Sequence, residues 1–133
     1  MKQVIIIIER ATDGTFSAYS DKVDGIWGMG DTPEQAKQSA LESLRLFKEN
    51  NPARKWPKIL QGQYELIFKF DAESLLNYYK KIFTKAGLER ITGINQKLLQ
   101  HYSSGLKKPR QLQSKKIENA LHDLGKELLS VQL

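Results

Sequence analysis

The stretch TGINQKLLQHYSSG, residues 92–105, is the most informative part of this chain. Gly93 suits a turn, Asn95 suits the N-cap of a helix, and Gly105 suits the end of that helix. Residues 90–117 hold seven Lys or Arg residues and no Asp or Glu. A turn followed by a short polar-faced helix in a cationic setting can enter the major groove of DNA, where phosphates supply affinity and side chains read base edges.

Helical spacing divides this predicted helix into two faces. Ile94, Leu99 and Tyr102 are expected to face inward. Glutamine offers a donor–acceptor pair to adenine, and lysine reaches guanine O6 and N7. The candidate base-reading residues on the outward face are Gln96, Lys97, Gln100 and His101. The candidate phosphate-binding residues are Asn95, Lys107, Lys108 and Arg110. The alternative is a solvated polar helix followed by a basic loop, which many small helical bundles contain.

Around this segment, residues 71–133 are predicted to be entirely helical. At Asp71 the apolar period changes from two to 3.6, and the helix that starts there is expected to break near Gly87. Leu88 and Ile91 predict a short second helix before the turn. The stripe of the first helix is predicted to contain Leu75, Tyr79, Ile82 and Ala86, and the stripe of the last helix Ile117, Leu121, Leu124 and Leu128.

Residues 1–70 are predicted to form a small β-β-β-α-β module. The apolar run Val4–Ile8 predicts a strand covered on both sides, and the Asp13-Gly14 pair predicts a tight hairpin. Residues 25–30 predict a weak third strand, bulged or closely approached by another backbone. Thr32 is expected to cap a helix that ends near Asn50, with Gln35 completing a capping box, and residues 64–70 alternate as a fourth strand.

Charge and composition support this division into modules 1–70 and 71–133. The first contains ten Lys or Arg and nine Asp or Glu residues, whereas the second contains eleven and six. An excess of positive charge in one half indicates a polyanionic partner for that half. The absence of cysteine excludes disulfides and thiol catalysis. Because the longest apolar run is far too short to span a membrane, we expect a cytoplasmic protein. The two modules together predict the α+β fold class.

Two resemblances extend this interpretation. The pattern from Leu88 through Thr92-Gly93-Ile94-Asn95-Gln96 to Gly105-x-Lys107-Lys108-Pro109 resembles the helix-turn-helix of lambda-repressor/Cro-like regulators, although Glu89 and Leu98 depart from it. The early apolar strand, the Asp13-Gly14 turn and the segment Gly28-x-Gly30-Asp31-Thr32-x-Glu34-x-Ala36 are similar to HicB antitoxins.

This second resemblance implies the antitoxin of a type II toxin–antitoxin system. Such a protein binds and silences a small HicA-type ribonuclease toxin, and as a repressor it binds the operator DNA of its own operon. It also implies a homodimer or higher homo-oligomer, because such regulators bind paired half-sites. No cofactor is implied. The alternatives are a stand-alone transcriptional regulator, whose first module senses a ligand or mediates oligomerisation, and an RNA-binding or nuclease module.

A nuclease would need several carboxylates around metal ions. The carboxylates of the first module are of the types, and at the positions, that turns and helix caps require, so no enzymatic activity is expected. The carboxylates considered are Glu9, Asp13, Asp21, Asp24 and Asp31. His101 and His122 lack the spacing of metal ligands, and no metal site is predicted. Trp27 is either a partner-binding anchor or core, and Trp56, in a loop, is the better candidate for an exposed anchor or a lid over the sheet.

Overall fold

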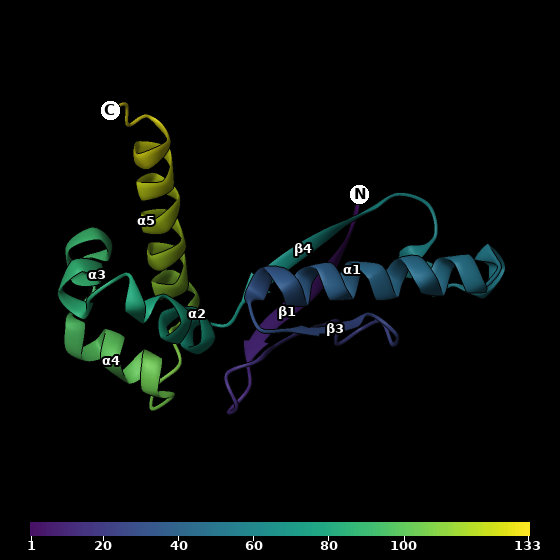
Figure 1. The fold of residues 1–133 in the computed structure, drawn as a ribbon, viewed down its shortest axis with the longest axis horizontal. Helices are drawn as coiled ribbons and strands as arrows, with labels where there is room; N and C mark the ends of the chain where they lie inside the picture. Colours follow the sequence, from purple (N-terminus) through teal and green to yellow (C-terminus); the bar gives the residue numbers. More distant parts are fainter. The chain divides into compact units, whose positions relative to one another are not determined.

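The computed structural model describes residues 1–133 and divides them into two compact units, Met1–Asp71 and Ala72–Leu133. The chain is mixed α+β, as the sequence predicted, with a four-stranded sheet and five α-helices (Figure 1). None of these helices combines the length and the apolar character that a membrane span requires.

The first unit contains the whole sheet. Its strands are β1 (Lys2–Arg10), β2 (Phe16–Tyr19), β3 (Trp27–Gly30) and β4 (Tyr64–Phe70), in the spatial order β3-β2-β1-β4. The pairs β1–β2 and β2–β3 are antiparallel, whereas β4 lies parallel to β1. The predicted hairpin turn between β1 and β2 is present. Gly14 adopts a φ of 88°, and the Asp13 carboxylate accepts a hydrogen bond of 3.0 Å from the Thr15 amide.

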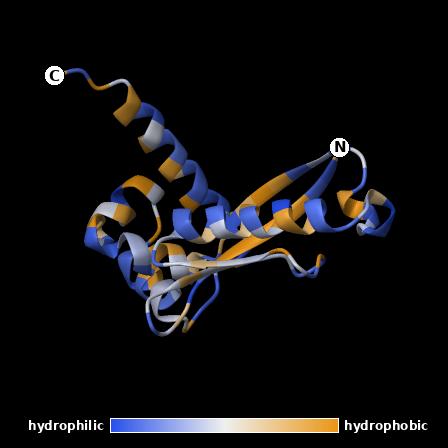
Figure 2. Cartoon of the chain, turned by 45° about the vertical axis from the view of Figure 1, so that its right-hand side comes forward, coloured by the Kyte–Doolittle hydropathy of each residue, from blue (hydrophilic) through white to orange (hydrophobic).

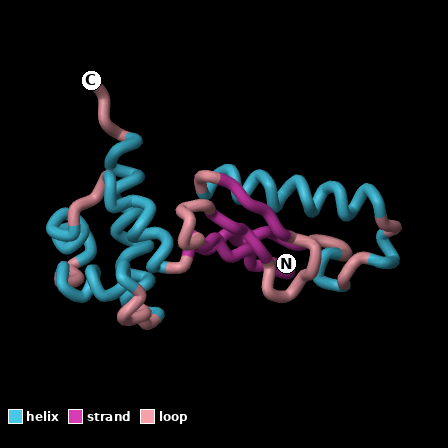
Figure 3. Tube along the Cα trace, turned by 60° about the horizontal axis from the view of Figure 1, so that its bottom comes forward, coloured by secondary structure: helices cyan, strands magenta, loops and turns pink.

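One face of the sheet is covered by α1 (Pro33–Asn50), the long helix drawn along the strands in Figure 3. Thr32 caps this helix by accepting a hydrogen bond of 3.1 Å from the Gln35 amide, while the Gln35 side chain accepts from the Asp31 amide instead of completing a capping box. The helix approaches β3 closely because Gly28 has no side chain. A Cβ atom at Gly28 would lie 2.7 Å from the Ala36 carbonyl oxygen, which confirms the predicted close approach.

The other face of the sheet is open, which corrects the expectation that the first strand is covered on both sides. Val4, Ile6 and Ile8 are buried toward α1, but Ile5, between them, is 37% exposed. Hydrophobic residues run along most of β1 in Figure 2, so its sequence does not alternate between apolar and polar residues. Only the alternating burial separates its two faces.

The second unit consists of α2 (Ala72–Tyr78), a 3-10 turn (Tyr79–Lys81), α3 (Lys85–Thr92), α4 (Gln96–Ser104) and α5 (Gln111–Leu129). The predicted break near Gly87 is wrong. The first helix ends earlier, and Thr84 caps α3 by accepting a hydrogen bond of 2.9 Å from the Gly87 amide. Gly87 therefore lies in the first turn of α3. Ile82, predicted to belong to the buried stripe, is 63% exposed.

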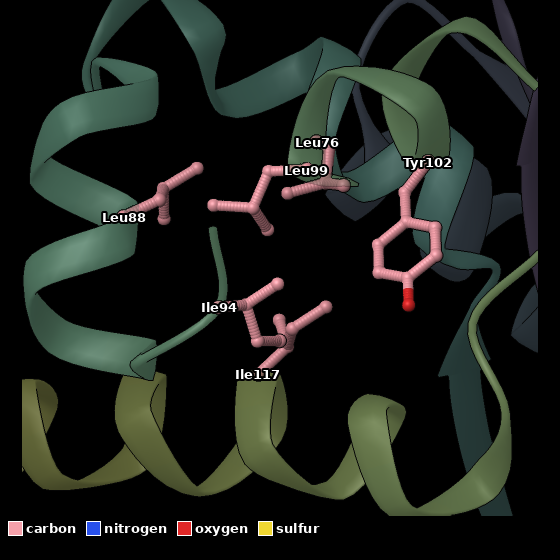
Figure 4. Packing of buried hydrophobic residues seen from close by; sticks show 6 residues of the cluster. All are labelled: Leu76, Leu88, Ile94, Leu99, Tyr102 and Ile117. Atoms are coloured by element: carbon pink, nitrogen blue, oxygen red, sulfur yellow. The ribbon is translucent and has the colours of Figure 1, made fainter. Parts of the chain in front are cut away.

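A cluster of buried side chains holds the second unit together (Figure 4). It joins all four helices and the turn between α3 and α4. Its members are Leu76, Leu88, Ile94, Leu99, Tyr102 and Ile117. The stripe predicted for α5 is covered only toward its amino-terminal end, because Ile117 is 5% exposed whereas Leu128 is 60% exposed.

Candidate functional site

The turn between α3 and α4 is fixed by local hydrogen bonds and one buried anchor. Gly93 ends α3 with a φ of 74°, and its amide donates to the Glu89 carbonyl at 2.8 Å. The Thr92 hydroxyl accepts a hydrogen bond of 3.1 Å from the Ile94 amide. Ile94 is only 3% exposed, so its side chain holds the turn against the core. The start of α4 is therefore held in one position relative to α3.

Two side chains occupy the first free amides of α4. The Asn95 side-chain oxygen accepts a hydrogen bond of 2.8 Å from the Lys97 amide, and the Glu89 carboxylate accepts one of 2.7 Å from the Gln96 amide. Acceptors at this place satisfy donors that lack helical partners, and a carboxylate there also interacts favourably with the helix dipole. These amides are consequently not free for a phosphate. The part of Asn95 left to donate is its side-chain NH₂ group.

The outward face of α4 presents Gln96, Lys97 and Gln100 to solvent, and their side chains make no hydrogen bond to the protein. On the opposite side Leu99 and Tyr102 are buried. This division into two faces is the one predicted from helical spacing.

His101 lies differently from its prediction, because it is half-buried and its Nδ1 atom is enclosed without a hydrogen-bond partner. Leu98 is half-buried and packs against the core cluster. Leu98 thus narrows the face available to a ligand, as its departure from the helix-turn-helix pattern indicated, and the partial burial of His101 narrows it further.

A basic loop follows α4. Gly105 ends the helix with a φ of 81°, and the Lys107 amide then donates to the His101 carbonyl at 3.2 Å. Lys107, Lys108 and Arg110 are exposed, and none forms an ion pair. Exposed and unpaired cations are free to approach phosphate groups.

The surroundings of α4 are less free of acid than the sequence indicates. Glu89 lies at its first turn, as described above. At its other end, a Cβ atom on Gly105 would lie 2.9 Å from a carboxylate oxygen of Glu73, which belongs to α2. The stretch 90–117 contains no acid, but the fold brings one carboxylate to each end of α4.

In the first unit, Trp27 is the more exposed of the two tryptophans, which fits the anchor rather than the core among the two alternatives for it, whereas Trp56 is not the exposed anchor that was expected. Trp27, on β3, is 54% exposed. Trp56 is half-buried, its indole N–H donates to the Asn51 carbonyl at 2.9 Å, and the Lys48 ammonium lies 4.7 Å from its ring centre. Trp56 is thus held within its own unit, and Trp27 is the one available to a partner.

Two of the candidate carboxylates, Glu9 and Asp13, form local hydrogen bonds. Glu9 accepts a hydrogen bond of 2.7 Å from the Tyr19 hydroxyl, and hydrogen bonds from Thr15 lower the pKa of Asp13 from its usual value. Nowhere do three or more His, Asp or Glu side chains gather closely enough to hold a metal ion. His122 is exposed on α5.

No protein-family model, curated protein or solved structure matches this chain.

Proposed function

We propose that this chain is a HicB-type antitoxin. Its second unit binds operator DNA and represses its own operon, and its first unit covers the active surface of a small HicA-type ribonuclease toxin. The resemblance carried by the sequence motifs motivates this proposal, and the geometry of α4 supports its DNA-binding part.

The observation that carries the DNA-binding role is the two-faced helix α4 behind a fixed turn. Leu99 is fully buried, while the side chains of Gln96 and Lys97 are exposed and form no hydrogen bond to the protein. In the proposed mechanism α3 and α4 act as a helix-turn-helix, and the amino-terminal half of α4 lies in the major groove. Gln96, Lys97 and Gln100 then read base edges, with His101 contributing at most its outer edge.

Phosphate contacts in this mechanism come from side chains rather than from the amides of α4, because those amides are occupied. The proposed contacts are Asn95, Lys107, Lys108 and Arg110. Two copies of the chain would place two α4 helices in successive major grooves, about 34 Å apart. The uncovered part of the α5 stripe, including Leu128, offers an apolar surface for such pairing.

The DNA-binding part is tested with the DNA immediately upstream of this chain's own gene. The full chain is expected to bind that DNA more tightly than a mixed-sequence duplex of equal length. Gln96→Ala should chiefly reduce this preference, because removing a bidentate base contact weakens discrimination by about 1–3 kcal/mol. Equal affinity of the unaltered chain for both duplexes would contradict a repressor.

The antitoxin part is tested by co-expressing the chain with the product of an adjacent reading frame that encodes a small basic protein. We expect the two proteins to purify together and the growth arrest caused by the small protein alone to be relieved. DNA binding without any such complex would favour a stand-alone transcriptional regulator.

A further inference from the structure

The face of the sheet that points away from α1 is unusually apolar. Register places Ile7, Tyr19 and Trp27 in one row across three strands, and Ile5 beside Ile67 in another. Trp27 is 54% and Met29 47% exposed. We call this surface the open face; its apolar and aromatic members are Ile5, Ile7, Tyr19, Trp27, Met29 and Ile67.

Such a surface is typical of a site that another molecule covers. A sheet with one solvated face normally alternates, with apolar residues inward and polar residues outward. Here β1 and β3 carry large apolar residues at positions that face away from the core. Contiguous exposed apolar surface of this kind on a folded domain indicates an interaction site.

The open face also carries negative charge. Register puts Glu9 and Glu65 on it, with Lys69 as the one cation among its strand residues. The Tyr19 hydroxyl donates to Glu9, and this hydrogen bond is the main reason that the pKa of Tyr19 rises to about 12. The charges of Glu9, Asp21 and Asp71 contribute to the same rise, so two further carboxylates lie near this part of the face.

Two lysines of α1 lie against aromatic rings on the covered face of the sheet. The Lys37 ammonium lies 4.8 Å from the ring centre of Phe68, and the Lys48 ammonium lies 4.4 Å from that of Tyr64. Both rings belong to β4 residues that share the covered face with Val4 and Ile6. Two lysines of α1 thus lie against rings of the covered face, whereas the strand residues of the open face carry two glutamates and one lysine.

We propose that the open face is the docking surface for a cationic protein, with Trp27 and Met29 in the dry centre of the interface and the carboxylates at its rim. This inference rests on the proposed function, in which the partner is a small ribonuclease. A ribonuclease must hold a polyanion, so its active surface is positively charged and complements this face. An apolar centre with a charged rim is the ordinary composition of a protein–protein interface.

The negative charge of the open face argues against two other occupants, RNA and a second copy of this chain. Exposed aromatic residues on a sheet can stack on RNA bases, but the carboxylates around Tyr19 would repel the phosphates. Two copies of this chain joined through their open faces would bring the same acids together, and like charges at an interface cost affinity.

The test measures binding of the small basic protein from the adjacent reading frame to full-length variants by calorimetry. Met29→Lys places a cation in the centre of the open face and is expected to weaken binding at least tenfold. Its matched control is Leu46→Lys on α1, because Leu46 is 44% exposed and receives the same substitution. A second pair, Glu65→Lys against Glu49→Lys on α1, reverses a rim charge and serves if Met29→Lys does not fold. Retained DNA binding and an unchanged melting temperature verify folding.

The possible outcomes separate the two proposals. Loss of binding in the open-face variants, with the α1 variants unaffected, supports both. Equal binding by all variants, or loss only in the α1 variants, overturns the open face but leaves the antitoxin role intact. If the unaltered chain does not bind the small basic protein, the antitoxin role fails and the docking inference fails with it.

Discussion

Removal of the three cations that follow α4 should change how DNA binding depends on salt. Lys107, Lys108 and Arg110 are exposed and form no ion pair, so each can contact a phosphate without first breaking a contact in the protein. We therefore expect the triple variant Lys107→Ala/Lys108→Ala/Arg110→Ala to bind DNA of any sequence more weakly and with a shallower salt dependence.

The size of the effect follows from counter-ion release. Each phosphate contact contributes a slope of about −0.9 to log K against log salt on duplex DNA, so three contacts per chain contribute about −2.7. Over a rise from about 50 to 200 mM salt, these three contacts make the unaltered chain lose roughly 40-fold more affinity than the triple variant.

The assay is a fluorescence-anisotropy titration of a labelled mixed-sequence duplex at several salt concentrations, which requires no knowledge of the operator. The matched control is Arg54→Ala/Lys55→Ala/Lys58→Ala, which removes three exposed cations from the connection between α1 and β4. Both triple variants lower the net charge from +6 to +3, since each loses three positive charges. A general effect of net charge would change both slopes equally, and that result would refute the assignment of the phosphate contacts to the loop after α4.

Three further predictions concern single residues. Glu89→Gln keeps an acceptor for the Gln96 amide but removes a negative charge beside α4. Affinity for the mixed-sequence duplex should therefore rise about two- to fivefold, which corresponds to a charge effect of about 0.5–1 kcal/mol. A fall in affinity in the same titration would show that the charge is needed to hold α4. Gly28→Ala should lower the free energy of unfolding in urea by about 1–3 kcal/mol, because the added Cβ would meet the backbone of α1. Gly125→Ala, where a Cβ meets nothing within 4 Å, should instead raise it by about 0.5–1 kcal/mol, and similar effects at both sites would contradict the close approach at Gly28. Tyr19 should ionise near pH 12 in a spectroscopic titration. Because its pKa is raised in the folded state, its contribution to stability is complete below pH 10 and is lost as the pH rises through about 12. Tyr19→Phe should remove this ionisation from the titration.

The elements that could be predicted from the sequence are those specified by neighbouring residues. The boundaries of α4 follow from Asn95, whose side chain reaches an amide two residues away, and from Gly105, whose positive φ ends the helix. The Asp13-Gly14 hairpin has the same local origin. In each case the two groups that form the stabilising contact lie only a few residues apart, so both can be recognised in the sequence.

Two kinds of element were mispredicted. In one, two local sequence signals compete; in the other, the burial of a strand depends on a helix that packs on it from elsewhere in the chain. The apolar spacing of Leu75, Tyr79 and Ile82 favours one continuous helix, and Gly87 looks like its breaker. The Thr84 cap prevails instead, because its hydroxyl satisfies the Gly87 amide at the start of a new helix. For β1, the repeated isoleucines fit a strand with either one or two covered faces, and only the position of α1 shows which face is buried.

The electrostatic surroundings of α4 show most clearly what a linear sequence omits. The acid-free stretch 90–117 predicts strong attraction for any DNA, but Glu89 and Glu73 reach the two ends of α4 from α3 and α2. Under the proposed function, these carboxylates oppose the sequence-independent attraction of phosphates close to the reading helix. Contacts of Gln96 and Gln100 with bases then supply a larger share of the binding free energy. Because a repressor must find its site among a vast excess of other DNA, its specificity ratio matters more than its total affinity, and a moderated positive field favours that ratio.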